Sequence, residues 1–489
     1  MIYVPATIPY MIGRNVLIQI ILTLLGSLIG FLSLSLSARF FGPNILGHLA
    51  YVLALTGIIF AFSDLGFSQA HIHFTAALNS AKKTLGTFLK LKLILLMIAG
   101  AIGLFIASLD PGQFKGIFVI VLLYEIISRF SEAIFITFEG LQQSIPQNVS
   151  RLIAKIVKLA AVIILGLKLT NVFGYSLTFL IEGLVLMTLS FWLIRHLFPL
   201  TFFSKLAKKY LIYSLPFFVI VPISYIQTNI ITILLKSFHS AKEVGYYAAS
   251  VNLTGYIKTL FGAIMIYFFP KISSLFQKQD LKSIQNYANL SLKYLLIIFT
   301  PIFIFSFLLR KEIILFILGQ EFLPAIPAFN LLLLGMFILM LVNPYSYILY
   351  ATKKHKSLIK VNLVGLLLTV ILSFYFMSQS GGLGLGATGA VLVSLITWFI
   401  TGVWSLILVK NKLNIFFFPK LFNYLIPAAL LVFLTNLIFT YFRTGLLIKL
   451  SGSVLAVLIY LLYLFVFKLL KLTDIEYFIN LLWTKRSKF

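Results

Sequence analysis

Charged side chains inside long apolar runs are the residues of this sequence that could do chemistry. An ionisable group at membrane depth is costly, and it usually faces a cavity or a partner of opposite charge. Lys258 lies near the middle of an apolar run at residues 244–269, and no acidic residue lies within two helical turns of it. Such a lysine must face water or a ligand, or lose its proton. We therefore expect Lys258 to line a cavity that attracts an anion.

Two other apolar runs carry stripes of charge. In the run 148–168, three basic residues fall within about 60° of one helical face at roughly 100° per residue: Arg151, Lys155 and Lys158. In the run 116–138 and just after it, four charged residues share a face by the same arithmetic: Glu125, Arg129, Glu132 and Glu139. The two stripes follow one another in the chain, so we expect them to lie close together.

Two interpretations of these stripes stay open. If the two helices form an antiparallel pair, ion pairs neutralise the stripes, and the expected pairs are Glu139–Arg151, Glu132–Lys158 and Glu125–Arg129. Alternatively, four basic against three acidic residues leave a positive remainder, which belongs to a cationic cavity that holds a diphosphate. The interpretations are compatible, because a ligand phosphate can displace a carboxylate from its partner.

Further ionisable residues are weaker candidates. Lys293, in the run 285–308, either lines the cavity or extends to the membrane interface. Arg39, at the end of the first run, either lines the cavity or anchors the interface. Four acidic residues could carry a coupling proton or sodium ion: Asp64, Glu125, Glu132 and Glu182. For Asp64 we expect a cap or an ion pair instead, because it lies near the end of its run.

The elements that must position these side chains are membrane-spanning helices. Of 489 residues, 61% are hydrophobic and 10% are charged, whereas soluble chains carry roughly 25% charge; the mean hydropathy is +1.06. A span needs about 20 mostly apolar residues. Fourteen runs qualify: 16–38, 45–67, 86–108, 116–138, 148–168, 172–194, 211–235, 244–269, 285–308, 324–350, 358–378, 387–409, 420–441 and 446–468. The chain has no cysteine, which excludes disulfides and thiol chemistry.

The basic residues predict the orientation of these spans. The net charge is +27, which in so apolar a chain indicates anionic lipid headgroups and membrane topology instead of nucleic acid. Of the Lys and Arg residues outside the spans, 21 lie in segments on the side of both termini and 8 lie on the other side. Because Lys and Arg resist translocation, we expect a multi-pass protein of the cytoplasmic membrane with both termini in the cytoplasm.

A weak internal repeat is present. Phe40 is followed after six residues by Gly47-His48-Leu49-Ala50, and Phe238 is followed after six residues by Gly245-Tyr246-Tyr247-Ala248. Both copies follow an odd-numbered span, as expected of two six-helix halves related by an axis along the membrane normal. The last two spans would then be an addition to the repeat.

Several short motifs resemble those of a known family. The opening signature of polysaccharide flippases in the multidrug/oligosaccharidyl-lipid/polysaccharide exporter superfamily is similar to Ala38-Arg39-Phe40-Phe41-Gly42-Pro43, Gly47 and Asp64-Leu65-Gly66. The second-half signature of that family resembles Ser214-Leu215-Pro216, Val244-Gly245-Tyr246-Tyr247-Ala248-Ala249 and Phe269-Pro270-Lys271-Ile272-Ser273. The resemblance covers nearly the whole chain; it departs at Leu46 and Leu49, where the family usually has aromatic residues.

The resemblance implies a fold and a function. The fold is an all-α integral membrane protein with fourteen transmembrane helices, two six-helix lobes as in multidrug and toxin extrusion (MATE) transporters, and two C-terminal helices. The lobes would comprise residues 1–200 and 201–415, followed by helices and a tail at 416–489. The implied function is to flip a polyisoprenyl-diphosphate-linked oligosaccharide by alternating access, for O-antigen-type lipopolysaccharide or another surface polysaccharide. Tyr246, Tyr247 and Tyr256 would hydrogen-bond its headgroup.

Two rival functions are less compatible with the sequence. A MATE-like multidrug cation antiporter needs an acidic cavity, but the chain has only 12 acidic against 39 basic residues. A membrane polymerase or glycosyltransferase for lipid-linked sugars needs catalytic residues in a sizeable outer loop, and no such loop is present. We expect no enzyme activity, no metal and no cofactor beyond an H⁺ or Na⁺ counter-ion. The expected partners are the lipid-linked oligosaccharide, anionic lipids and polysaccharide assembly proteins, with no nucleic acid.

Overall fold

The structure is a computed structural model that describes residues 12–78, 80–109, 115–198, 200–215, 217–352, 355–413, 422–442 and 445–471. These residues form helices and connections and contain no strand. The long helices are α1 (Ile12–Ile59), α3 (Ala81–Leu109), α4 (Lys115–Gly140), α5 (Ile145–Lys168), α6 (Val172–Ile194), α8 (Phe217–Phe238), α9 (Ala241–Gln277), α10 (Leu281–Leu308), α12 (Ile326–Ala351), α13 (His355–Met377), α14 (Gly386–Leu413), α15 (Phe422–Tyr441) and α16 (Leu446–Val466). Short helices are α2 (Phe67–Leu78), α7 (Ser204–Ser214), α11 (Arg310–Ile317), η1 (Phe60–Ser63), η2 (Arg195–Leu197) and η3 (Gln320–Ala325).

Most of the long helices have the length and composition of membrane spans. Within the described residues, ten segments are long and apolar enough to cross a membrane. Three more long helices, α4, α5 and α9, coincide with the predicted spans that carry intramembrane charge. The all-helical membrane fold predicted from the sequence is therefore confirmed. The first predicted span lies within α1, and the second begins in α1 and continues through η1.

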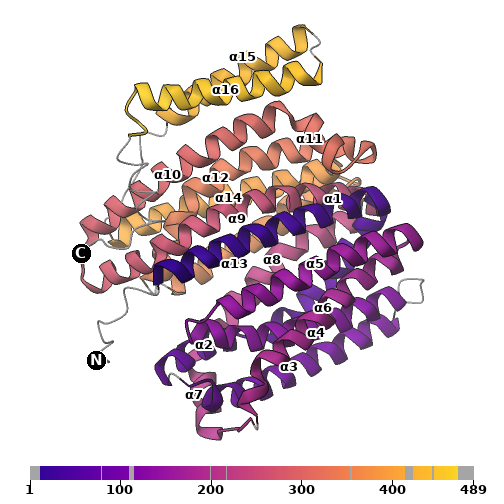
Figure 1. Cartoon of the computed structure of the whole chain (residues 1–489), viewed down its shortest axis with the longest axis vertical. Helices are drawn as coiled ribbons and strands as arrows, with labels where there is room; N and C mark the ends of the chain where they lie inside the picture. Colours follow the sequence, from indigo (N-terminus) through magenta and orange to yellow (C-terminus); the bar gives the residue numbers. More distant parts are fainter. Residues whose placement is uncertain are drawn as a thin grey trace.

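The helix α1 consists of two spans that meet at Gly42. Its apolar segment runs over 46 residues from Ile18 to Ser63, about twice the length that one crossing requires. Gly42 has φ 68° and ψ 174°, outside the helical region, and a positive φ favours glycine because it has no Cβ atom. Pro43 then begins the second half, as proline commonly does at a helix start. The two halves meet at the right-hand end of the bundle in Figure 1, which we call the Gly42 end.

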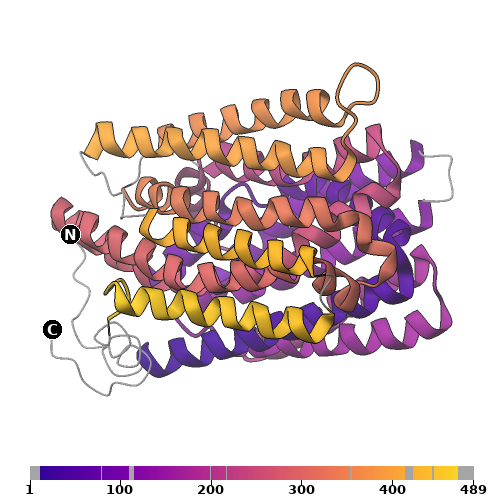
Figure 2. The same cartoon turned by 90° about the horizontal axis from the view of Figure 1, so that it is seen from above.

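The long helices form two groups and an additional layer. We call α1–α6 the N-lobe and α8–α14 the C-lobe. The boundary between them is formed by α1, which packs against α8 and α9. The pair α15 and α16 packs against α10 on the outside of the C-lobe (Figures 1 and 2).

The two copies of the sequence repeat contact each other at the Gly42 end. A Cβ atom on Gly47 would lie 1.7 Å from the carbonyl oxygen of Ala241, and one on Gly245 would lie 1.9 Å from that of Pro43. Positions 47 and 245 are 198 residues apart, and so are 43 and 241. The contact is therefore reciprocal, as at an interface with two-fold symmetry. The two glycines allow α1 and α9 to touch backbone to backbone, which closes this end between the lobes.

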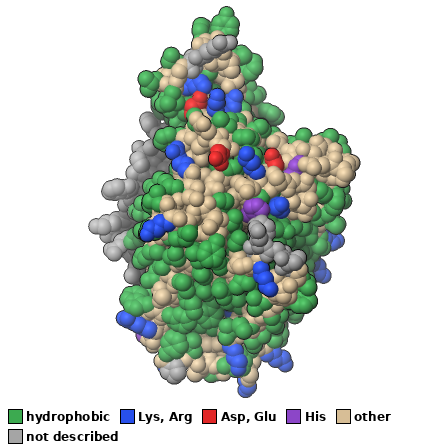
Figure 3. All heavy atoms as spheres, turned by 90° about the vertical axis from the view of Figure 1, so that its right-hand side faces the viewer, with side chains coloured by type: hydrophobic (Ala, Val, Ile, Leu, Met, Phe, Trp, Pro, Cys, Tyr) green, Lys and Arg blue, Asp and Glu red, His purple; other side chains and the backbone are tan. Residues whose placement is uncertain are grey.

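Apolar side chains are exposed on the flanks of the bundle. Leu167 is 71% exposed and Phe105 64% exposed, and large exposed apolar residues occur on nearly every long helix. In water such a surface would aggregate, whereas acyl chains solvate it. Figure 3 shows the Gly42 end, where hydrophobic side chains also cover much of the face and Lys and Arg side chains are scattered among them and among backbone atoms.

The predicted span 211–235 differs from the structure at its start. The chain forms the short helix α7 up to Ser214, and the spanning helix α8 begins at Phe217. Pro216 lies between them, and helices usually end at or before the residue that precedes a proline. Although α7 follows residue 200, it packs against α2 and α3 of the N-lobe, where the Tyr210 hydroxyl and the His71 Nδ1 are 2.7 Å apart. The lobe boundaries at residues 200 and 415 remain predictions from the sequence.

Candidate functional site

A polar cavity lies inside the C-lobe, and we call it the C-lobe cavity. It has a volume of about 410 Å³ and is enclosed by α8, α9, α12, α13 and α14. Its polar lining comprises eight hydroxyl side chains, two amides, a tyrosine, a tryptophan and one lysine: Ser224, Thr228, Ser346, Thr369, Ser394, Thr397, Thr401, Ser405, Gln227, Asn362, Tyr247, Trp398 and Lys258. Among the lining residues that the structure describes there is no acidic side chain.

Lys258 is the charged residue of this cavity. Its ammonium lies 4.6 Å from the centroid of the Trp398 ring, a cation–π contact that partly replaces lost hydration. Within the described residues it forms no ion pair. The structure thus places Lys258 in a polar cavity of the C-lobe, and the described part of the chain provides no carboxylate partner for it.

The charged residues of α4 lie at the boundary between the lobes. The Arg129 Nε donates to Glu125 Oε2 at 2.6 Å, which is the expected i,i+4 pair. The Arg129 guanidinium also lies 5.4 Å from the Phe60 ring centroid and 5.2 Å from that of Tyr225 in α8. Arg129 therefore links α4 of the N-lobe to α8 of the C-lobe, while Glu125 neutralises its charge.

The basic stripe of α5 is paired differently from the sequence-based expectation. Arg151 pairs with two of the three carboxylates of α4, at 2.5 Å from Glu132 Oε2 and, as predicted, near Glu139, at 3.9 Å from its Oε1. Lys158 instead pairs with Glu182 of α6 at 2.7 Å, so the predicted Glu132–Lys158 pair is wrong. The reason is that α6 packs closely against both α4 and α5 and brings its carboxylate within reach of Lys158.

A double-mutant cycle can check this pairing. We expect the changes Lys158→Gln and Glu182→Gln to be non-additive by about 0.5–3 kcal/mol in the free energy of unfolding, because each single change leaves a largely buried charge unpaired. The control cycle combines Lys158→Gln with Glu132→Gln, which should be nearly additive. Thermal unfolding of the purified variants measures both cycles, and equal coupling in the two would contradict the pairing.

The remaining basic candidates lie apart from one another. Lys155 donates from Nζ to the carbonyl oxygen of Gly26 in α1 at 3.1 Å and has no ion pair among the described residues. Lys293 lies in α10, with its Nζ 5.7 Å from the Tyr294 ring centroid. Arg39 donates to the carbonyl oxygen of Phe316 in α11 at the Gly42 end. The structure therefore does not gather the basic candidates into one cluster.

The fourth acidic candidate, Asp64, is also paired. Lys92 of α3 donates to its Oδ1 at 2.6 Å, and Ser68 donates to the same oxygen. The other ion-coupling candidates Glu125, Glu132 and Glu182 are held by Arg129, Arg151 and Lys158. All four candidates thus neutralise a basic side chain of the N-lobe.

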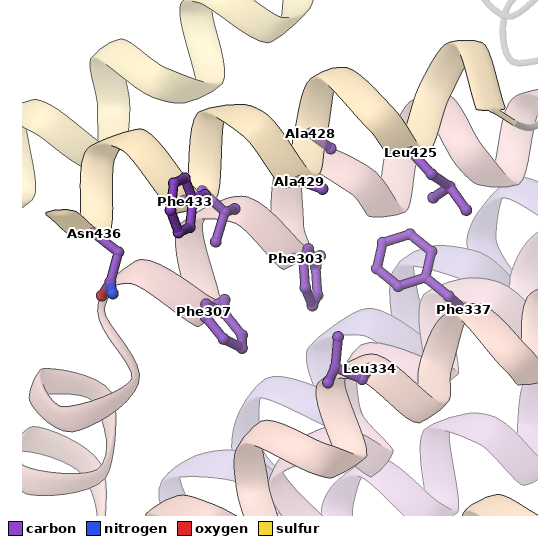
Figure 4. A pocket seen from close by; sticks show the side chains of 10 residues that line it. Phe303, Phe307, Leu334, Phe337, Leu425, Ala428, Ala429, Phe433 and Asn436 are labelled. Atoms are coloured by element: carbon purple, nitrogen blue, oxygen red, sulfur yellow. The ribbon is translucent and has the colours of Figure 1, made fainter.

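An apolar groove lies between the C-lobe and α15. It has a volume of about 450 Å³ and is lined by Phe303, Phe307, Leu334, Phe337, Leu425, Ala428, Ala429, Val432, Phe433 and Asn436. Figure 4 shows the rings of Phe303, Phe307 and Phe337 facing the residues of α15 across this groove. Asn436 at one end is its polar residue, and it accepts from the Arg310 guanidinium at 3.3 Å. The groove can accommodate a hydrocarbon chain.

Some site residues could not be identified from the sequence. Trp398 and the hydroxyl residues of α13 and α14 line the C-lobe cavity, but in the sequence they are isolated polar residues of apolar runs. Of the three tyrosines expected to contact a headgroup, Tyr247 lines the cavity. Tyr246 is buried against Phe322 with ring centroids 6.1 Å apart, and Tyr256 packs on Gly30 and Phe31.

The chain is similar to known proteins in sequence profile and in fold. The profile of a family described as polysaccharide biosynthesis protein matches residues 36–327, more than half of the chain. No curated protein sequence matches significantly.

Solved membrane transporters share the fold at low sequence identity. The lipid II flippase MurJ in an inward closed conformation superposes with a TM-score of 0.72 at 17% identity, over 90% of this chain and 97% of MurJ. A transporter of the multidrug/oligosaccharidyl-lipid/polysaccharide exporter superfamily from Pyrococcus furiosus is described as having a binding pocket of reverse polarity. It superposes with a TM-score of 0.59 at 13% identity, over 82% of this chain and 96% of the transporter. The MATE multidrug transporter DinF-BH superposes with a TM-score of 0.59 at 16% identity, over 83% of this chain and 97% of DinF-BH. These likenesses show that the fold is that of the MurJ and MATE transporters.

Proposed function

The chain belongs to the polysaccharide biosynthesis protein family, within the multidrug/oligosaccharidyl-lipid/polysaccharide exporter superfamily, and on that premise we propose that it flips a polyisoprenyl-diphosphate-linked oligosaccharide. The transport would proceed across the cytoplasmic membrane by alternating access of the two lobes. Its product would serve an O-antigen-type lipopolysaccharide or another surface polysaccharide. The chain is a multi-pass membrane transporter.

The C-lobe cavity carries this proposal. It is polar, it lies among long apolar helices, and its charged residue is Lys258, which has no ion-pair partner in the described part of the chain. An anionic, sugar-rich headgroup needs a cation together with hydrogen-bonding groups. The apolar groove beneath α15 suits the lipid chain, which does not have to leave an apolar environment during transport.

The polarity of the site also separates this function from its nearest rival. A multidrug antiporter for organic cations needs free carboxylates in its cavity. The described lining of the C-lobe cavity contains no carboxylate, and the acidic candidates of the N-lobe are each paired with Lys or Arg. A membrane polymerase or glycosyltransferase is also a weaker alternative, because the similar solved structures are transporters.

The charge distribution supports further parts of the proposal. Both termini would lie in the cytoplasm, since 21 of the counted basic residues lie on their side and 8 on the other. The same residues would contact anionic lipids. Transport would be driven by exchange of H⁺ or Na⁺ or by the membrane potential, and polysaccharide assembly proteins would receive the product.

Deletion of the gene tests the proposed function. We expect one lipid-linked oligosaccharide to accumulate in the deletion strain, because synthesis on the cytoplasmic side continues while export stops. Mass spectrometry of the lipid extract identifies the compound, and a plasmid copy of the gene should reverse the accumulation. An unchanged lipid profile, or transfer of radiolabelled sugar by the purified protein, would contradict a flippase function.

A further inference from the structure

The C-lobe cavity offers mainly hydrogen-bond acceptors. Six of its hydroxyl side chains donate their proton to a backbone carbonyl four residues earlier in their own helix, at 2.6–3.1 Å: Ser224, Thr228, Thr369, Ser394, Thr401 and Ser405. A hydroxyl has one proton and two lone pairs, so each of these oxygens can act only as an acceptor toward a ligand. Thr369 and Ser394 also contact the hydroxyl groups of Thr397 and Tyr247, which leaves the other four as the more accessible acceptors. The wall therefore suits a ligand that brings several O–H donors.

A diphosphate is poorly matched to this wall. Its oxygens are acceptors with several negative charges, and they would face the lone pairs of the six hydroxyl groups. Among the described lining residues Lys258 is the single basic one, and it balances one negative charge. The other donors of this lining, which include the amides of Gln227 and Asn362 and the N–H of Trp398, are neutral. The cavity thus matches a ligand with one negative charge and many hydroxyl groups.

An amide and an aromatic ring complete the match to a sugar. The Asn362 Nδ2 is buried and lies beside the Tyr350 hydroxyl. Because an amide nitrogen carries two N–H donors, at least one of them can bind a ligand oxygen. The Trp398 ring lies beside Lys258 and offers a flat apolar surface for the C–H face of a pyranose. The Lys258 ammonium rests on this ring, and a ligand carboxylate would replace that weaker contact by a charge-assisted hydrogen bond.

We infer that the C-lobe cavity is a subsite for an acidic sugar, a hexuronate unit whose carboxylate binds Lys258 and whose hydroxyl groups donate to the hydroxyl wall. The inference rests on the proposed function, because it places one sugar of the transported oligosaccharide in this cavity. It also assigns the diphosphate to a place outside the cavity. Specificity for acidic oligosaccharides would then arise in the C-lobe.

Binding of free sugars to the purified full-length protein tests the subsite. The probes are glucuronate, galacturonate, the methyl ester of glucuronate, glucose and pyrophosphate, each followed by saturation-transfer NMR and by thermal unfolding in detergent. We expect at least one hexuronate to bind about tenfold or more tightly than the ester and glucose, because only the hexuronate brings the carboxylate. Lys258→Gln should remove this preference. Lys360→Gln, which removes an exposed lysine of α13, should retain it.

A second variant keeps the test informative if Lys258→Gln folds poorly. Thr401→Val removes one acceptor of the wall and should weaken hexuronate binding while the preference for the carboxylate remains. Lys258-dependent binding of pyrophosphate without hexuronate binding would overturn the inference, and so would the absence of any Lys258-dependent binding of both hexuronates. The two proposals can fail separately: an accumulated oligosaccharide without acidic sugar would overturn the subsite only, whereas hexuronate binding without accumulation would overturn the flippase function only.

Discussion

Replacing Gly47 by valine should abolish transport while the protein still enters the membrane at a normal level. The added side chain has no space, because even a Cβ atom would lie 1.7 Å from a backbone oxygen of α9. The lobes could then no longer close at the Gly42 end. Overpacking costs about 1–3 kcal/mol, which shifts a two-state equilibrium by a factor of about 5–150. Gly245→Val should act in the same way from the other side of the contact.

Two measurements check the effect of Gly47→Val. Complementation of the deletion strain reports transport, and a cysteine introduced at the buried Ser250 reports opening. Since the chain has no cysteine of its own, a membrane-impermeant maleimide should label that position only when the Gly42 end is open. The matched control is Gly255→Val in α9, where a Cβ atom meets nothing within 4 Å. Full transport by Gly47→Val would show that closure of this end is not required.

The sequence predicts the helices well because each span is determined locally. A run of about 20 apolar residues must be a helix that crosses the membrane, since hydrocarbon satisfies no backbone group. The break in α1 is equally local, because Gly42 and Pro43 are the residue types that a bend requires. The start of α8 is harder to locate, since the apolar residues before Pro216 continue into α7 and obscure the boundary.

The pairing of charges could not be obtained from the same information. Helical periodicity shows that Lys155 and Lys158 share a face, but not which neighbour that face meets. The partner Glu182 of Lys158 lies on α6, which the chain reaches only after another turn. The C-lobe cavity is a still less local feature, because its lining comes from five helices that each contribute a few scattered residues.

Lys258 shows how far a sequence argument about an intramembrane charge reaches. A lysine without a carboxylate on its own helix needs a partner on another helix or a polar cavity. The sequence could not distinguish these alternatives, and the structure shows the cavity and the Trp398 ring. What the lysine binds depends on the donors and acceptors around it. These can be identified only from the hydrogen bonds that the hydroxyl groups of α8, α13 and α14 form in the structure.

Asp64→Asn is the substitution for which we expect the largest loss of stability. It leaves Lys92 with an uncompensated charge, and in this pair the side chains are only 6% and 11% exposed. Breaking such a pair costs about 3–5 kcal/mol, whereas the double change Asp64→Asn with Lys92→Met should recover most of it, because no lone charge remains buried. Thermal unfolding in detergent of the single and double variants measures this recovery.

The pair of Lys449 and Glu312 provides the matched comparison. It has the same 2.6 Å distance, but its side chains are 25% and 19% exposed, so water and mobile lipid headgroups compensate a lone charge better. We expect Glu312→Gln to cost about 1 kcal/mol or less. If Asp64→Asn proves as stable as the unmodified protein yet fails to transport, the carboxylate is not a structural partner of Lys92. It would then be a carrier of the coupling ion, since loss of the negative charge would act on transport without acting on the fold.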